Sequence, residues 1–367
     1  MRRHQSRETH CPPINTLFCH WPGRWKFDRS LPLRYFSCQN SLAAMHSLHD
    51  LPAPAKLNLF LHVTGRRPDG YHLLQSAFAL IDWCDTLHIE RRAGGRLSRE
   101  DLVAPLPADD LTLRAARALQ AATGCTQGAH IAIEKRIPAQ AGMGGGSSDA
   151  ATALLALNRL WQLGLDGAAL AHIGLQLGAD VPFFLFGRHA WAEGVGEKLQ
   201  AIDLPPTRFV VLKPPAGLDT AQIFRSPELR RNTKPAIVRA FAASPLAFGK
   251  NDLQPVAERL NPQVTQGIQL LQSAGLNARM TGSGSAVFAP LHQERQSGPI
   301  TPPQGWLMKE CSSIAIHPLA GWAASTISGM IHCESSRAGE SPSWLRHRIL
   351  IPTCEGSSPS SPAKHSG

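Results

Sequence analysis

The sequence has no run of about 20 consecutive apolar residues, which is the length that a helix needs to cross a bilayer. An integral membrane protein is thereby excluded, and we expect a soluble, cytoplasmic protein with no membrane partner. Charged residues make up only 17% of the 367 positions and hydrophobic residues 43%, so the chain can bury hydrophobic cores and is not disordered over most of its length. At roughly 150 residues per domain, this length predicts about two domains.

Cysteines at the close spacing of a zinc site are also missing from the central part of the sequence. Cys84, Cys125 and Cys311 are scattered there, and the other cysteines lie in the two terminal flanks. Scattered thiols in odd number suit a reducing cytosol better than a disulfide framework. We expect ordinary core or half-buried cysteines, and the sequence identifies no metal ligand.

The positive charge of the chain is concentrated at one end. Half of the net charge of +10 lies in residues 1–44, where it carries little information about a folded site. We therefore expect no nucleic-acid partner. The sequence gives no indication of the oligomeric state.

Residues 1–44 and 323–367 lack the hydrophobic periodicity of helices and strands. We expect the first segment to be an unstructured extension that is not translated naturally, with Met45 as the true start; a targeting segment is the alternative. We expect the last segment to be an unstructured tail. Back-translation of 349–352 and 355–359 resembles the anticodon loop and T-loop of a glutamine tRNA gene, which suggests read-through of a lost stop codon.

Between these flanks, strands and helices follow one another without a regular repeat. We expect strands at 55–64, 73–89, 130–134, from 208, at 278–280, 286–288 and 306–309, and helices at 111–122, 148–163, 168–177, 222–224, 237–243 and 261–274. Such a mixture indicates an α+β fold rather than a doubly wound parallel sheet.

A glycine-rich loop at 138–151, Pro-Ala-Gln-Ala-Gly-Met-Gly-Gly-Gly-Ser-Ser-Asp-Ala-Ala, is the strongest chemical signal. Its glycines allow the backbone to close around a ligand. We expect Ser147, Ser148 and Asp149 to cap the helix that follows, whose free N–H groups would bind phosphate. The loop is neither a Walker A motif nor a dinucleotide fingerprint. A flexible, capped turn is the alternative.

The segment 52–63 is a predicted strand whose two faces carry different side chains. Its leucines alternate with a second set of side chains, Lys56, Asn58, Phe60 and His62. A solvated outer face would also explain the polar members of this second set. The turn sequence Arg-Pro-Asp-Gly at 67–70 then leads to Tyr71 and His72, which can stack on or hydrogen-bond to a planar ring.

Two weaker signals lie further along the chain. Asp180 is a single carboxylate at the edge of the apolar run 181–186. Because an unpaired buried acid is costly, it is a helix cap, an ion-pair partner or a catalytic base. Segment 280–288 carries small hydroxylated residues between glycines, which would let the backbone approach a ligand, or would form a hairpin turn.

These four segments, in this order, resemble the GHMP family of small-molecule kinases over about Leu51 to Leu319. The motifs at 52–59, 67–72, 144–151 and 178–184 separate one branch of the family from homoserine, galactose and mevalonate kinases. That branch uses ATP and Mg²⁺ to phosphorylate the 2-hydroxyl of 4-diphosphocytidyl-2-C-methyl-D-erythritol in the non-mevalonate isoprenoid pathway. The resemblance implies this activity here.

The same resemblance implies a two-domain α+β GHMP kinase fold. Residues 51–205 would form an N-terminal domain like domain 2 of ribosomal protein S5, and 206–322 a ferredoxin-like C-terminal domain, with ATP and substrate between them. Asp180 would take the proton of the substrate hydroxyl, assisted by Lys56. The ATP-binding residues would be Pro138, Gly142, Met143, Gly144, Gly145, Gly146, Ser147 and Ser148. Tyr71, His72 and Phe224 would hold the cytosine ring, with polar contacts from Asn58 and Thr220.

Three positions depart from the family pattern. Met143 replaces the usual leucine, a change of similar volume that should be tolerated. Asp110 stands where the family commonly has asparagine, which calls into question a contact to the adenosine there. Residues 292–305 carry Gln, Ser and Pro where the family continues with an apolar helix, so we expect that helix to be missing.

Two other functions are compatible with parts of this pattern. An ATP-dependent decarboxylase of a diphosphorylated acid would use the same glycine loop. An RNA-binding module would account for the basic sequence and for an S5-like fold.

Overall fold

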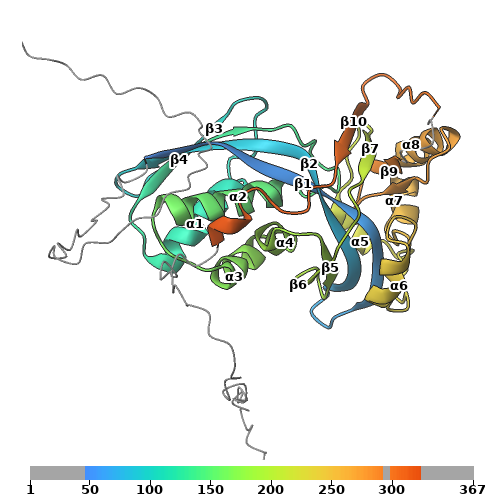
Figure 1. The fold of residues 1–367 in the computed structure, drawn as a ribbon, viewed down its shortest axis with the longest axis horizontal. Coiled ribbons are helices and arrows are strands. Elements are labelled where there is room, and N and C mark those ends of the chain that lie inside the picture. Colours follow the sequence, from blue (N-terminus) through green and yellow to red (C-terminus); the bar gives the residue numbers. More distant parts are fainter. Residues whose placement is uncertain (1–45, 292–297, 324–367) are drawn as a thin grey trace, which may run out of the picture. The chain divides into compact units, whose positions relative to one another are not determined.

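The computed structural model describes residues 46–291 and 298–323 (Figure 1). The prediction for 1–44, and that for 323–367 apart from its first residue, lie outside the described residues. The described part combines two β-sheets with helices, which is the α+β architecture that the sequence predicts.

The first sheet has six strands and is built on a long β-hairpin. Its strands are β1 (Ser47–Arg66), β2 (His72–Arg92), β3 (Leu97–Asp101), β4 (Gly128–Glu134), β5 (Ala190–Glu193) and β6 (Lys198–Ala201). The order is β3-β4-β2-β5-β6, with β1 paired to β2. All pairs are antiparallel except β3 with β4. The three strands that sequence reasoning missed, β3, β5 and β6, have only four or five residues.

Four helices lie together on one face of this sheet (Figure 1): α1 (Leu111–Thr123), α2 (Gly145–Leu160), α3 (Gly167–Leu177) and α4 (Val181–Phe186). Helix α2 is the central one, and buried residues occur all around it rather than along one stripe. Its many alanines allow this, since a small side chain lets the sheet on one side and the other helices on the other approach closely. The buried helix holds the glycine loop at its N-terminus in a fixed position.

The second sheet has four strands in the order β10-β7-β9-β8. They are β7 (Arg208–Lys213), β8 (Arg279–Met280), β9 (Val287–Leu291) and β10 (Leu307–Ser312), accompanied by α5 (Thr220–Arg225), α6 (Val238–Ala243), α7 (Gln254–Leu260) and α8 (Pro262–Ser273). Helix α7 was not predicted. Residues 298–306 contain no helix; the rest of the segment after β9 where a helix was expected to be missing, 292–297, lies outside the described residues.

Strand β1 contributes to three hydrophobic clusters in turn. Leu51 packs in the first cluster with α1–α4, Leu57 in the second, and Leu61 in the third with β7 and β9. Every residue from 53 to 63 is buried, so the interpretation of one strand face as solvated is wrong. The strict alternation also fails, because the pairing of β1 with β2 shifts register between Asn58 and Phe60.

The end of the described chain returns to the first sheet. The amide of Ile314 donates to the Leu80 carbonyl at 3.0 Å, the amide of His317 donates to the Gly187 carbonyl at 2.8 Å, and Leu319 is buried in the first cluster. The short 3₁₀ turn Ala320–Ala323 follows. The domain boundaries given above stay a prediction.

Candidate active site

A cavity of about 1260 Å³ brings the four sequence motifs together. Its lining includes nearly all of the predicted site residues: Lys56, Asn58, Tyr71, His72, Pro138, Gly142, Met143, Gly144, Gly145, Gly146, Ser147, Asp180, Thr220 and Phe224. Ser148 is the exception. Its hydroxyl donates to the Pro54 carbonyl at 2.7 Å and is fully buried, so its side chain supports the loop from behind instead of facing the cavity.

Lys56 and Asp180 form an ion pair within this lining. Lys56 Nζ lies 3.5 Å from Asp180 Oδ2, and the lysine side chain is 4% exposed whereas that of the aspartate is 34% exposed. Asp180 occupies the residue before α4 but makes no capping hydrogen bond with its side chain. Of the three interpretations of this acid, the structure therefore disfavours the helix cap and contains the ion pair.

The position of Lys56 is fixed by its neighbours. Its ammonium donates a hydrogen bond to Asn58 Oδ1 and lies 5.1 Å from the centroid of the Phe78 ring. The other side of the Asn58 amide donates to Ser76 Oγ at 2.8 Å, and Ser76 Oγ donates in turn to the Phe60 carbonyl. This buried chain aims the lysine at Asp180.

The glycine loop ends at the N-terminus of α2, but the predicted capping residues are wrong. The helix begins at Gly145 after Gly144, which has φ of +72°, and Ser148 and Asp149 lie inside the first turns. The first intrahelical bond runs from the Ser148 amide to the Gly144 carbonyl at 2.9 Å. The earlier amides, of Gly145, Gly146 and Ser147, belong to the turn whose N–H groups lack intrahelical partners. They line the cavity at the positive end of the helix dipole.

A second loop, 281–284, closes against the glycine loop. Thr281 Oγ1 accepts a 2.9 Å hydrogen bond from the backbone N–H of Asn58 and donates to the Gly142 carbonyl at 3.3 Å. A Cβ on Gly142 would come within 2.2 Å of the Thr281 carbonyl oxygen. The weakest of the four sequence signals thus lies at the cavity, and Gly142 is required for contact between the two loops.

A half-buried cation beside the glycine loop was not predicted. Lys135 Nζ is paired with Asp85 and, at 2.6 Å, with Asp149 Oδ2, and a Cβ on Gly145 would lie 3.4 Å from it. Burial and the neighbouring Asp85 carboxylate raise the pKa of Asp149 to about 8, against the opposing effect of Lys135. Lys135 and Asp149 both line the cavity, and no local pattern in the sequence identifies them.

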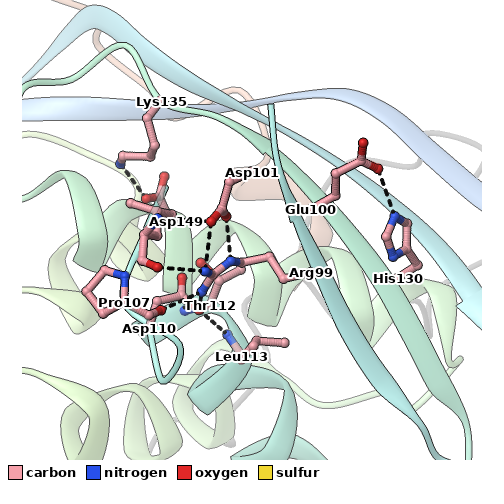
Figure 2. A network of polar contacts seen from close by, with 11 residues as sticks. Arg99, Glu100, Asp101, Pro107, Asp110, Thr112, Leu113, His130, Lys135 and Asp149 are labelled. Atoms are coloured by element: carbon pink, nitrogen blue, oxygen red, sulfur yellow. Dashed lines mark hydrogen bonds and ion pairs between the residues drawn. The ribbon is translucent and has the colours of Figure 1, made fainter. Parts of the chain in front are cut away.

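Figure 2 shows this pair next to a second network around Arg99. Arg99 is paired through both oxygens of Asp101 and, at 2.6 Å, with Asp110. Asp110 also accepts from the amides of Thr112 and Leu113 and so caps α1. The carboxylate that replaces the family's asparagine is therefore fully engaged in fixing the cavity wall.

The other end of the cavity is aromatic. The His72 and Phe224 rings lie 4.9 Å apart with an interplanar angle of 34°. Tyr71 is 64% exposed, unusual for a large ring, and Thr220 Oγ1 lies 2.6 Å from Ser283 Oγ. The five residues predicted to bind substrate thus fall in two adjacent groups, Asn58 beside Lys56 and the other four around this aromatic end.

Among the described residues, no cluster of three His, Cys, Asp or Glu side chains has the arrangement of a metal site. None of the helices in that part of the chain has both the length and the apolar character of a membrane span. Cys84, Cys125 and Cys311 are free thiols there, as expected.

Known proteins are similar to most of this chain. The family models described as GHMP kinases N terminal domain and GHMP kinases C terminal match residues 110–188 and 233–298. The 4-diphosphocytidyl-2-C-methyl-D-erythritol kinase of Paracidovorax citrulli (strain AAC00-1) is 66% identical over 76% of this chain and 99% of its own length. The protein of that name from Variovorax paradoxus (strain S110) is 61% identical over 76% and 100%. The chain belongs to the GHMP kinase family. It is a small-molecule kinase.

Solved structures agree with this assignment. The crystal structure of a 4-(cytidine 5'-diphospho)-2C-methyl-D-erythritol kinase has 40% identity and a TM-score of 0.57, and covers 65% of this GHMP kinase and 88% of its own chain. A mevalonate kinase with 14% identity and a TM-score of 0.53, covering 73% and 99%, shares the fold. The two-domain α+β arrangement expected from the sequence is confirmed.

Proposed function

We propose that this kinase transfers the γ-phosphoryl group of ATP to the 2-hydroxyl of 4-diphosphocytidyl-2-C-methyl-D-erythritol, in the cytoplasm, as a step of isoprenoid precursor synthesis. The observation that carries the proposal is the position of the Lys56–Asp180 pair, which lines the same cavity as the glycine loop and the aromatic end. The names of the relatives that are 57–66% identical support the choice of substrate.

The glycine loop fits the phosphate tail of ATP. The amides that begin α2 offer hydrogen-bond donors at a helix N-terminus. Gly144 has φ of +72° and little space for a side chain, since a Cβ would lie 3.0 Å from the Phe184 ring. Pro138 and Met143 complete this side of the cavity. Loop 281–284 closes against the loop and keeps it in one conformation.

The aromatic end fits the cytosine ring of the acceptor. Tyr71 and Phe224 supply flat apolar surfaces, and bases commonly stack on such rings. His72, Asn58 and Thr220 supply polar groups beside them. An exposed tyrosine in a cavity mouth is accounted for if a bound base covers it.

The reaction then needs one proton transfer and one displacement. The 2-hydroxyl oxygen attacks the γ-phosphorus, the bond from that phosphorus to the β,γ-bridging oxygen breaks, and ADP leaves. Asp180 accepts the hydroxyl proton at Oδ2, and the Lys56 ammonium offsets negative charge on the attacking oxygen. Two unit charges about 4 Å apart interact by roughly 4 kcal/mol at an effective dielectric constant of 20. Positioning and charge neutralisation are the main requirements of phosphoryl transfer.

Mg²⁺ bound with ATP would neutralise charge on the phosphates. Ser147 and Asp149 are the oxygen-bearing side chains in the first turns of α2 that line the cavity, and Asp149 Oδ1 is buried without a hydrogen-bond partner among the described residues. These two would hold the ion. Because Mg²⁺ is usually held by one or two carboxylates together with phosphate oxygens and water, a site made only of protein groups is not needed.

The experiment that tests the substrate is a coupled assay of ADP formation with the purified full chain, ATP, Mg²⁺ and the proposed acceptor, followed by ³¹P NMR of the product. We expect a new phosphomonoester on the 2-hydroxyl and no turnover with the 2-deoxy analogue. Turnover with mevalonate diphosphate instead, with release of CO₂, would reject the proposal in favour of the decarboxylase.

A further inference from the structure

Arg231 links the His72 ring to the backbone that carries Phe224 at the aromatic end of the cavity. It lies in the segment between α5 and α6 and lines the cavity. Its Nε donates a 3.0 Å hydrogen bond to His72 Nε2. Its Nη2 donates to the carbonyls of Phe224, at 2.9 Å, and Ser226, at 2.8 Å, and its Nη1 donates to the carbonyl of Leu229 at 3.0 Å. Four donors of one rigid guanidinium are thus engaged.

This contact dictates where the proton of His72 sits. A guanidinium can only donate hydrogen bonds, so His72 Nε2 must carry a lone pair. In a neutral imidazole the proton is then on Nδ1, which becomes a hydrogen-bond donor. Among residues 46–291 and 298–323, Nδ1 has no hydrogen-bond partner, and His72 lines the cavity.

The surrounding charges favour the neutral ring. Burial lowers the pKa of His72, and the charges of Arg231 and Arg66 lower it further. Arg66 lies at the end of β1, opposite His72 in the strand pairing. A protonated ring would have to break the contact to Arg231.

We propose that Arg231 is a positioning residue that determines which base the cavity binds. It holds His72 as the Nδ1–H tautomer, so that the ring presents a hydrogen-bond donor to the cavity. This donor favours cytosine over uracil. Cytosine N3 carries a lone pair, whereas uracil N3 carries a proton, so the same donor makes a hydrogen bond with one base and opposes a second donor in the other. An enzyme site that hydrogen-bonds its ligand discriminates strongly when a group is left unpaired. This inference rests on the proposed function, which supplies the cytosine ring.

The test compares four variants, Arg231→Gln, Arg230→Gln, His72→Phe and the double variant His72→Phe/Arg231→Gln. Arg230→Gln is the matched control, because it removes the same charge from the exposed neighbouring position. On each preparation we would measure kcat/KM for the cytidine substrate and for its uridine counterpart. Their ratio does not depend on the fraction of folded enzyme. In wild type and the Arg231→Gln and Arg230→Gln variants, ¹⁵N NMR of the imidazole reports the His72 tautomer directly.

We expect wild-type His72 to carry its proton on Nδ1, and Arg231→Gln to mix the tautomers and raise the pKa of His72. The cytidine-to-uridine ratio should fall by roughly tenfold or more, which is the size of one lost hydrogen bond, mainly through KM. Arg230→Gln should behave as wild type. In the His72→Phe background the Arg231 change should leave the ratio as it is, because Arg231 acts through the histidine.

Two results would overturn the inference: a wild-type His72 protonated on Nε2, or an Arg231→Gln variant with unchanged tautomer and unchanged ratio. If the wild type turns over neither substrate, the proposed function fails, and binding of CDP against UDP is measured instead. A preference for CDP that Arg231→Gln abolishes still supports the role of Arg231, whereas equal affinities reject it.

Discussion

The amide of Asn58 donates a hydrogen bond to the hydroxyl of Thr281, a residue 223 positions away. The same hydroxyl donates to the Gly142 carbonyl. One fully buried side chain therefore ties the strand that carries Lys56 to the loop proposed to hold ATP.

Replacing Thr281 by valine should weaken both stability and activity. The change keeps the shape but leaves the Asn58 amide without its partner, and a buried unsatisfied donor costs about 1–3 kcal/mol. We expect a corresponding decrease in the free energy of urea unfolding and a raised KM for ATP. Thr207→Val is the control, since within the described part of the chain that hydroxyl bonds only to the nearby Pro205 carbonyl. An unchanged midpoint together with an unchanged KM would show that the link is dispensable.

The cluster of Lys135 with the buried Asp85 and Asp149 should respond unequally to loss of its members. Lys135→Met leaves the buried Asp85 carboxylate without its cation and should cost about 3–5 kcal/mol. Asp149→Asn replaces a carboxyl group whose pKa of about 8 keeps it mostly protonated at pH 7 and leaves one cation and one anion, so it should cost much less. In the double variant the loss should be clearly smaller than the sum of the single losses.

Urea unfolding without nucleotide measures these three values. Lys198→Met, at an exposed position, controls for the loss of a lysine. Equal decreases in the free energy of unfolding for Lys135→Met and Asp149→Asn would contradict the charge arrangement of this cluster.

His317 should make the protein sensitive to acid. It is 1% exposed, and burial lowers its pKa to about 4 from 6.5. Its Nδ1 accepts from the Leu319 amide, which holds the neutral form. Because the unfolded chain binds the proton more tightly, the stabilisation is complete above about pH 6.5 and is lost as the pH falls toward 4. The total is up to about 3 kcal/mol.

The comparison that isolates this effect is the unfolding free energy of wild type, His317→Asn and the exposed control His172→Asn between pH 4 and 7.5. In His317→Asn the unfolding free energy should decrease less at low pH than in wild type. In His172→Asn it should decrease as in wild type. Three parallel curves would contradict the assignment.

Short-range patterns predicted the parts of the site that each lie within one segment. The glycine loop, the strand with Lys56 and Asn58, and the turn before Tyr71 were each visible within a dozen residues. Helix α2 was found for the same reason, although its start was placed three residues late because serine and aspartate are favoured caps. Here glycine fills that position, since Phe184 and Lys56 crowd it.

The family resemblance implied that Lys56 lies beside Asp180, but other contacts across the chain escaped prediction. Arg231 bonds to His72 across 159 positions and Lys135 to Asp85 across 50, and neither has a local pattern. Helix α4 was missed because six apolar residues have too little length to show a helical period. The burial of both faces of β1 depends on the second sheet, which a single strand cannot reveal.

The most direct test of the mechanism is the single-turnover rate of phosphoryl transfer in Asp180→Asn, with ATP and acceptor saturating. Asp203→Asn, at an exposed position, is the control. If Asp180 takes the proton, its variant should be slower by about 10²–10⁴-fold while both substrates still bind with near wild-type affinity. A rate within a few-fold of wild type would contradict the role of Asp180.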